Sequence, residues 1–153
     1  MNWRVTVVLL LVVAAGGCTP RVDLRVRQKL LPNPTTECLG SALSRSPDVV
    51  QVPRLERAYG SLIFWVILRD STAQDGQRQA TVTRPAPPDS GGKVEVNFVW
   101  FGTQRPAKAE EEAVISLGNR VLERLRGACA PQTPTRIECD YGDGRTWLCA
   151  QPV

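Results

Sequence analysis

Alternation of apolar and polar side chains marks two stretches of this chain as β-strands. Within residues 93–101, every second position carries an apolar side chain (Val94, Val96, Phe98, Trp100), with Glu95 and Asn97 among the residues between them. A weaker alternation covers residues 80–84 and follows Asp75-Gly76, a dipeptide typical of tight turns. A period of two places successive side chains on opposite faces of a sheet. Both stretches therefore predict strands with one face toward a core.

A third stretch, residues 62–68, is apolar at every position and reads Leu-Ile-Phe-Trp-Val-Ile-Leu. Its length and its β-branched and aromatic residues favour a strand over a helix. Because both faces are apolar, we expect this strand to lie centrally in the sheet and to be covered on both sides.

The pattern changes to helical spacing over residues 107–126. Apolar side chains recur there three and four positions apart, at Val114, Leu117, Val121 and Leu125. Glu110 to Glu112 lie near the start and arginines near the end, as the helix dipole favours. We expect Gly127 to end this helix.

A shorter helix is predicted over residues 36–44. Thr35 or Thr36 can cap its first turn, and Pro47 prevents it from continuing. Val49, Val50 and Val52 then predict a short strand that Pro53 stops.

Residues 18–34 are interpreted as a lipidated N-terminus and a tether. Val22, Leu24 and Val26 alternate with charged residues, which allows pairing as an edge strand, and prolines bracket the segment. Its basic side chains can be interpreted in two ways: they attract anionic lipid, or they form the solvated face of a strand.

The last segment, residues 136–149, predicts a hairpin around Gly142-Asp143-Gly144. A turn centred on Gly144 places Cys139 opposite Cys149 and Tyr141 opposite Trp147, with both pairs on one face. Cys139 and Cys149 are then expected to form a disulfide. This leaves Cys38 and Cys129 as the second pair, and each continues the apolar stripe of its helix.

Together these elements predict an α+β domain over residues 35–153. We expect a mainly antiparallel sheet with two helices on one face and a C-terminal disulfide-closed hairpin. A chain of 153 residues is long enough for one such domain.

The residue content argues against several chemistries. The chain contains no histidine, so catalysis by Ser-His-Asp or Cys-His arrangements is excluded. The cysteines lack the close-spaced pairs of structural zinc sites, so we expect no metal and no cofactor. The formal net charge of +4 is too small, and too evenly spread, for a nucleic-acid interface. We therefore expect a protein that is not an enzyme and binds no nucleic acid.

The N-terminus has the features of an export signal. Arg4 precedes an apolar run, residues 5–15, that is too short to span a bilayer and ends in Ala15-Gly16-Gly17-Cys18. Small residues directly before a cysteine make this segment resemble the signals of bacterial lipoproteins. The resemblance implies cleavage before Cys18 and acylation of that cysteine. Cleavage after Gly17 by an ordinary signal peptidase and an uncleaved anchor are the alternatives.

The number of cysteines favours the lipoprotein interpretation. The chain has 5 cysteines, and lipidation of Cys18 leaves an even set for an oxidising compartment. Residues 1–17 are then the signal peptide. By the same resemblance, Thr19 after the cysteine implies sorting to the periplasmic face of the outer membrane.

The predicted role is non-catalytic: an envelope protein that acts through protein–protein interaction or assembly. The alternative is a periplasmic inhibitor or immunity-type lipoprotein that blocks an envelope enzyme. For docking we single out the hairpin tip, with Tyr141, Asp143 and Trp147, because aromatic side chains are frequent interface anchors.

Overall fold

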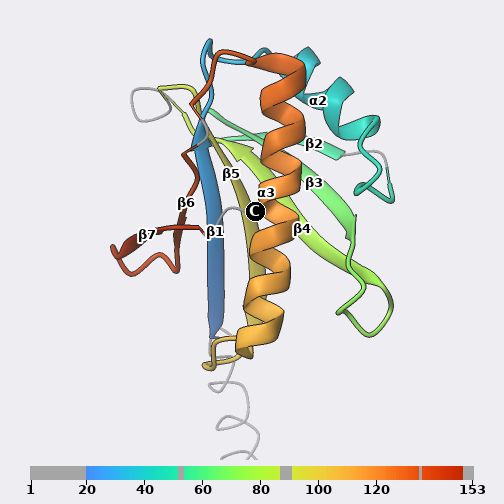
Figure 1. The fold of residues 1–153 in the computed structure, drawn as a ribbon, viewed down its shortest axis with the longest axis vertical. Coiled ribbons are helices and arrows are strands. Elements are labelled where there is room, and N and C mark those ends of the chain that lie inside the picture. The colour runs from blue at the N-terminus through green and yellow to red at the C-terminus, as the bar shows by residue number, and fades with distance from the viewer. Residues whose placement is uncertain (1–19, 52–53, 87–90, 135, 150–153) are drawn as a thin grey trace, which may run out of the picture.

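The computed structural model describes residues 20–51, 54–86, 91–134 and 136–149. A seven-stranded antiparallel sheet, in the order β2-β3-β4-β5-β1-β6-β7, carries two helices on one face (Figure 1). The strands are β1 (Arg21–Lys29), β2 (Arg54–Ala58), β3 (Ser61–Arg69), β4 (Gln77–Arg84), β5 (Lys93–Phe101), β6 (Glu138–Asp140) and β7 (Thr146–Leu148). The helices are α2 (Thr36–Ser44) and α3 (Lys108–Cys129). The predicted α+β class is confirmed.

The core lies between the sheet and the helices. Alternate residues of the strands point into it, among them Leu24 of β1 and Phe98 of β5. Leu122 of α3 belongs to the same buried cluster and packs on it from the helix side. The long helix approaches the sheet closely because Gly118 faces Val26, where an added Cβ would lie 2.9 Å from a valine methyl carbon. The alternation that predicted β5 therefore reflects its buried face.

The helix predictions are confirmed with one correction. Thr35 caps α2 by accepting a hydrogen bond from the Cys38 backbone N–H. The long helix does not end at Gly127, as predicted, but continues to Cys129. Cys129 is bonded to Cys38, and the following Ala130 is fully buried. These contacts outweigh the roughly 1 kcal/mol that a glycine costs inside a helix.

The interpretation of residues 18–34 as a tether is wrong for the part that the structure describes. β1 is not an edge strand but pairs with β5 on one side and β6 on the other. Its Leu24 and Val26 are fully buried under α3. The folded domain therefore includes β1, since its hydrogen bonds and core contacts join the first and last parts of the chain.

The apolar strand β3 is covered on one face only. Leu62, Phe64, Val66 and Leu68 are buried, whereas Trp65 on the other face is half-exposed. The unpredicted β2 shields its outer edge, and β2 escaped notice because it is largely exposed and has no apolar alternation. The strand predicted at Val49 is instead an isolated bridge to Leu68, and residues 52–53 lie outside the described part.

Both predicted disulfides are present, Cys38–Cys129 and Cys139–Cys149. The hairpin register differs from the prediction, because Cys139 pairs with Trp147 and the turn centres on Asp143. Gly142 and Gly144 flank Asp143 with φ of 76° and 80°, a conformation that glycine adopts readily. The disulfide therefore joins diagonal neighbours rather than opposed residues.

Among the described residues, no helix combines the length and apolar character needed to cross a membrane. The predicted signal peptide and Cys18 lie outside the described residues.

Candidate functional site

The sheet face opposite the helices is covered by no element of the described chain, and we call it the open face. It is formed by the alternate strand residues that do not enter the core. It exposes four large apolar side chains: Trp65 (50% exposed) on β3, Val99 (40%) and Phe101 (80%) on β5, and Leu148 (62%) on β7. The middle of the face is polar.

Across β5, β1 and β6 the open face carries an ordered network of charges. Arg27 on β1 contacts Asp140 at 3.0 Å, Glu138 at 3.8 Å and Glu95 at 3.9 Å. Arg27 also donates a hydrogen bond of 3.0 Å to the Thr146 hydroxyl on β7. These cross-strand pairs fix the short C-terminal hairpin onto the sheet.

Neutral side chains fill the centre of the open face. The Asn97 side-chain amide donates to the hydroxyls of Thr81 and Thr83, both at 3.3 Å. This polar strip separates the charge network from the apolar side chains of β3.

Trp65 is the main apolar feature on the β3 side of the open face. Its indole N–H donates to Glu56 Oε2 at 2.9 Å, which fixes the ring on the sheet surface. A pocket of about 280 Å³ lies beside the ring and is lined in part by Arg54 and Ile67. Arg54 forms no ion pair with a described residue, so the pocket combines an apolar wall with an available cation.

The predicted docking residues at the hairpin tip are brought together, but two of them are occupied within the protein. The Tyr141 hydroxyl donates to Glu111 at the start of α3. Arg105 lies 4.1 Å above the tyrosine ring and pairs with Asp143 at 3.2 Å. Burial and the negative charge of Glu111 raise the pKa of Tyr141, so its hydroxyl stays protonated.

Trp147 behaves differently from Tyr141. Its ring centroid lies 5.7 Å from that of Tyr141, and 36% of the residue is exposed. The next residue, Leu148, is 62% exposed. On the hairpin, Trp147 and Leu148 are therefore available for contact with a partner, whereas the predicted Tyr141 and Asp143 are engaged within the protein.

A second charged cluster links the β3–β4 turn to the start of α3. Arg78 bonds Asp70 at 2.5 Å and Glu110 at 2.8 Å, and Glu110 also accepts from the Trp100 indole. Burial by itself raises the pKa of Asp70, but hydrogen bonds from Thr72 and Arg78 outweigh it and lower that pKa. These carboxylates hold the fold together, and no group of three or more metal-ligating side chains gathers among the described residues.

The open face was not foreseen from the sequence. Trp65 lies in an uninterrupted apolar run, which predicted cover on both sides, and Phe101 is the last residue of its strand. That these residues lie on the same face of the sheet follows only from the strand order and register. Comparison of the chain with protein families, with curated proteins and with solved structures finds no match.

Proposed function

We propose that this protein is a lipid-anchored envelope protein, held by Cys18 at the periplasmic face of the outer membrane, that acts without catalysis by binding a protein partner on its open face. The observation that carries the proposal is the exposure of Trp65, Val99 and Phe101 on one sheet face. The solvated face of an antiparallel sheet is ordinarily polar. Exposed aromatic side chains with a polar rim are typical of protein interfaces.

The side chains around Trp65 define the chemistry of the partner. The pocket beside the ring suits one aliphatic or aromatic side chain, and Arg54 at its rim suits a carboxylate. We therefore expect an apolar contact on the partner with an acidic residue next to it.

The lipid anchor is supported by the signal-like residues before Cys18, and the first strand indicates which end of the domain follows the anchor. Arg21 pairs with Phe101, and the Gly102 N–H donates to the Pro20 carbonyl at 2.7 Å. The chain therefore enters the sheet beside Phe101, which places that end of the open face nearest to Cys18. A partner bound on the open face would lie beside the anchoring membrane.

Two substitutions test the proposal. Cys18→Ser is expected to abolish fatty-acid incorporation and to release the protein from membranes. Trp65→Ser is expected to preserve folding, because the ring is half-exposed, and to weaken partner binding by about 2 kcal/mol or roughly 30-fold.

Trp147→Ser is the matched control, since it removes the same ring from the hairpin. If Trp147→Ser weakens binding and Trp65→Ser does not, docking occurs at the hairpin, as the inhibitor alternative requires. If Cys18→Ser stays on the membrane to the same degree as wild type, the anchor is wrong.

A further inference from the structure

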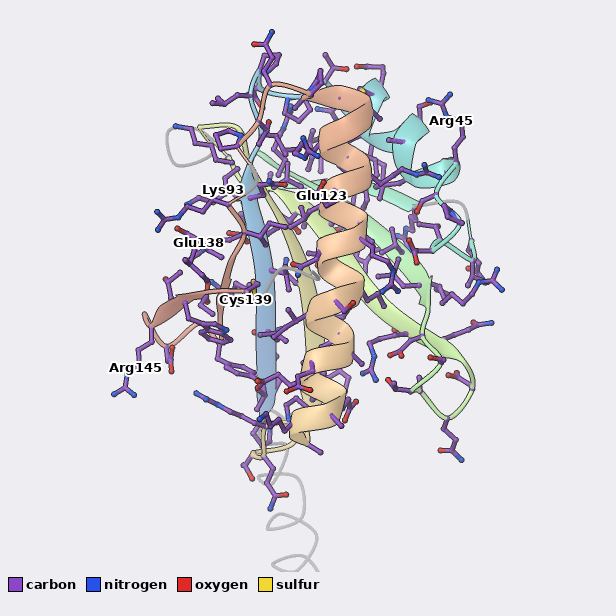
Figure 2. All side chains as sticks on the ribbon, viewed as in Figure 1. Arg45, Lys93, Glu123, Glu138, Cys139 and Arg145 are labelled. Atoms are coloured by element: carbon purple, nitrogen blue, oxygen red, sulfur yellow. A yellow bond between two sulfur atoms is a disulfide. The ribbon has the colours of Figure 1, made fainter. Side chains whose placement is uncertain are left out.

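At the end of the open face where β1 finishes, two lysines lie directly opposite each other. Lys29 of β1 pairs with Lys93 of β5 in the sheet register. Arg136 lies on the other side of β1 and lines the same pocket, which has a volume of about 360 Å³. Figure 2 shows Lys93 toward the upper end of β1, with Glu138 below it.

This juxtaposition is electrostatically unfavourable. Like charges opposed across two strands destabilise a sheet. Neither lysine forms an ion pair with a described residue. Glu138 is the carboxylate that lines the pocket, and it is already shared by Arg136 at 3.1 Å and Arg27 at 3.8 Å.

The next positions along β1 show how the same sheet balances charge elsewhere. Arg27 stands between Glu95 and Glu138, and Arg25 is paired with Asp140 at 4.0 Å. At Lys29, by contrast, the strand partner Lys93 carries a charge of the same sign. Two opposed cations with Arg136 lining the same pocket are the pattern expected when a ligand supplies the missing negative charge.

Gln28 fixes one wall of this pocket. It is 2% exposed, and its side-chain nitrogen donates to the Pro134 carbonyl at 2.9 Å. This hydrogen bond holds Pro134, which lines the pocket, against β1.

We propose that this pocket binds a phosphate monoester, with its dianion between Lys29, Lys93 and Arg136. Lysine is a point-charge phosphate ligand, and arginine matches the phosphate oxygens with two parallel N–H groups. The apolar side chains of Leu31 and Pro134 line the pocket beside these polar groups. A volume of about 360 Å³ is within the range of small-ligand sites.

The position of the pocket indicates the source of this ligand. β1 runs from Arg21 to Lys29, and eight steps of about 3.3 Å place the pocket roughly 26 Å from the strand's first residue. In Figure 1 the strand spans the length of the sheet. If Cys18 is the anchor, as proposed above, the pocket faces away from the anchoring membrane. A soluble phosphate ester therefore fits the site, and a headgroup of that membrane does not.

The test uses the lipid-anchored protein purified in neutral detergent, with glucose 1-phosphate as the probe and chloride at matched ionic strength. Calorimetry is expected to show saturable binding by wild type. Lys29→Gln/Lys93→Gln is expected to bind at least about tenfold more weakly, since the site then lacks its two opposed charges. Lys108→Gln/Arg145→Gln, at two residues that do not line the pocket, is the control of equal charge change and is expected to bind like wild type.

Thermal unfolding checks that the variants fold. Without ligand, Lys93→Gln is expected to melt at or above the wild-type temperature, because it relieves the lysine–lysine repulsion. The probe is expected to raise the melting temperature of wild type and of the control variant, but not that of the double lysine variant. Absence of saturable binding by wild type, or equal binding by the double variant, overturns the phosphate site. Competition by phosphatidylglycerol vesicles for the probe overturns the assignment to a soluble ester. Neither result affects the test of Cys18 and Trp65.

Discussion

Asp70 and Arg78 show how single residues connect distant parts of this fold. Asp70 is buried beside the β3–β4 turn, and Arg78 links it to Glu110 on α3 while lying 5.5 Å from the centre of the Trp100 ring. Removing one partner of a buried ion pair leaves the other charge without compensation. This contact joins a turn to a helix that begins 30 residues after Arg78.

Asp70→Asn is therefore expected to lower the free energy of unfolding by about 2–3 kcal/mol, because the retained contact to Glu110 compensates Arg78 in part. Asp75→Asn in the neighbouring turn is the control. Asp75 is exposed and accepts only the Gln77 backbone N–H among the described contacts, so a change within about 0.5 kcal/mol is expected. Urea unfolding measures both. Equal effects of the two substitutions would contradict the role given to Arg78.

The same pair predicts a pH dependence. The folded-state pKa of Asp70 lies below its usual value, so the stability that it contributes is complete above about pH 5. That contribution is lost as the pH falls through the lowered folded-state pKa. The difference in unfolding free energy between wild type and Asp70→Asn should be constant from about pH 5 to 8 and shrink in stronger acid. A difference that persists unchanged to about pH 2 would show that Asp70 does not act through its charge.

The positions of single residues could be predicted from the sequence where the neighbouring residues determine them. Cys139 and Cys149 lie on the two arms of a hairpin marked by two glycines, and Cys38 and Cys129 extend the apolar stripes of their helices. Trp65 was misplaced, because a run that is apolar at every position does not show which face is covered. Arg78 was not singled out, because its partners lie on other elements.

Among the elements, α3 owes its position to a close contact with β1. Gly118 faces Val26 so closely that an alanine Cβ would lie 2.9–3.2 Å from three valine carbons. Gly127, in the last turn of the same helix, has no atom within 4 Å of an added Cβ. Close packing therefore requires a glycine at position 118 but not at position 127.

Gly118→Ala is expected to destabilise the protein by about 1–2 kcal/mol, because overpacking exceeds the gain in helix propensity. Gly127→Ala is expected to stabilise it by up to about 1 kcal/mol, since only the propensity changes. Thermal or urea unfolding of the two variants gives the comparison. Stabilisation by both would mean that α3 does not rest on β1 as described.

The two disulfides close loops of very different length, with 91 and 10 residues of sequence separation. On the chain-entropy account, the loss of Cys38–Cys129 costs up to about 4.6 kcal/mol and the loss of Cys139–Cys149 up to about 2.8 kcal/mol. Paired alanine variants are expected to follow that order in urea unfolding. A larger cost for the hairpin pair would indicate that the hairpin, rather than the helix pair, limits stability.

At the element scale, the two helices and the strands β4 and β5 were predictable because their periodicity is regular. β2 was not, since an exposed edge strand has no apolar face. The role of β1 was underestimated because its partners, β5 and β6, lie about 70 to 110 residues later in the chain. Its alternation was visible, but strand order was not.

At the scale of the whole molecule, the two faces of the sheet differ in what covers them. The helices and both disulfides stabilise one side, while the open face presents Trp65 and Phe101. Because the core lies on the covered face, side chains on the open face can change without removing core contacts. We propose that this division lets a small lipid-anchored domain stay rigid and bind a partner.

Crosslinking from the open face in intact cells tests this account most directly. A photoreactive phenylalanine analogue replaces Trp65 in the chain that retains Cys18, and the matched control carries it at Glu112 on the exposed side of α3. The account predicts one discrete crosslinked product from position 65 that disappears with Arg54→Glu, and no such product from position 112. Equal products from both positions, or a product that is unchanged by Arg54→Glu, would contradict docking on the open face.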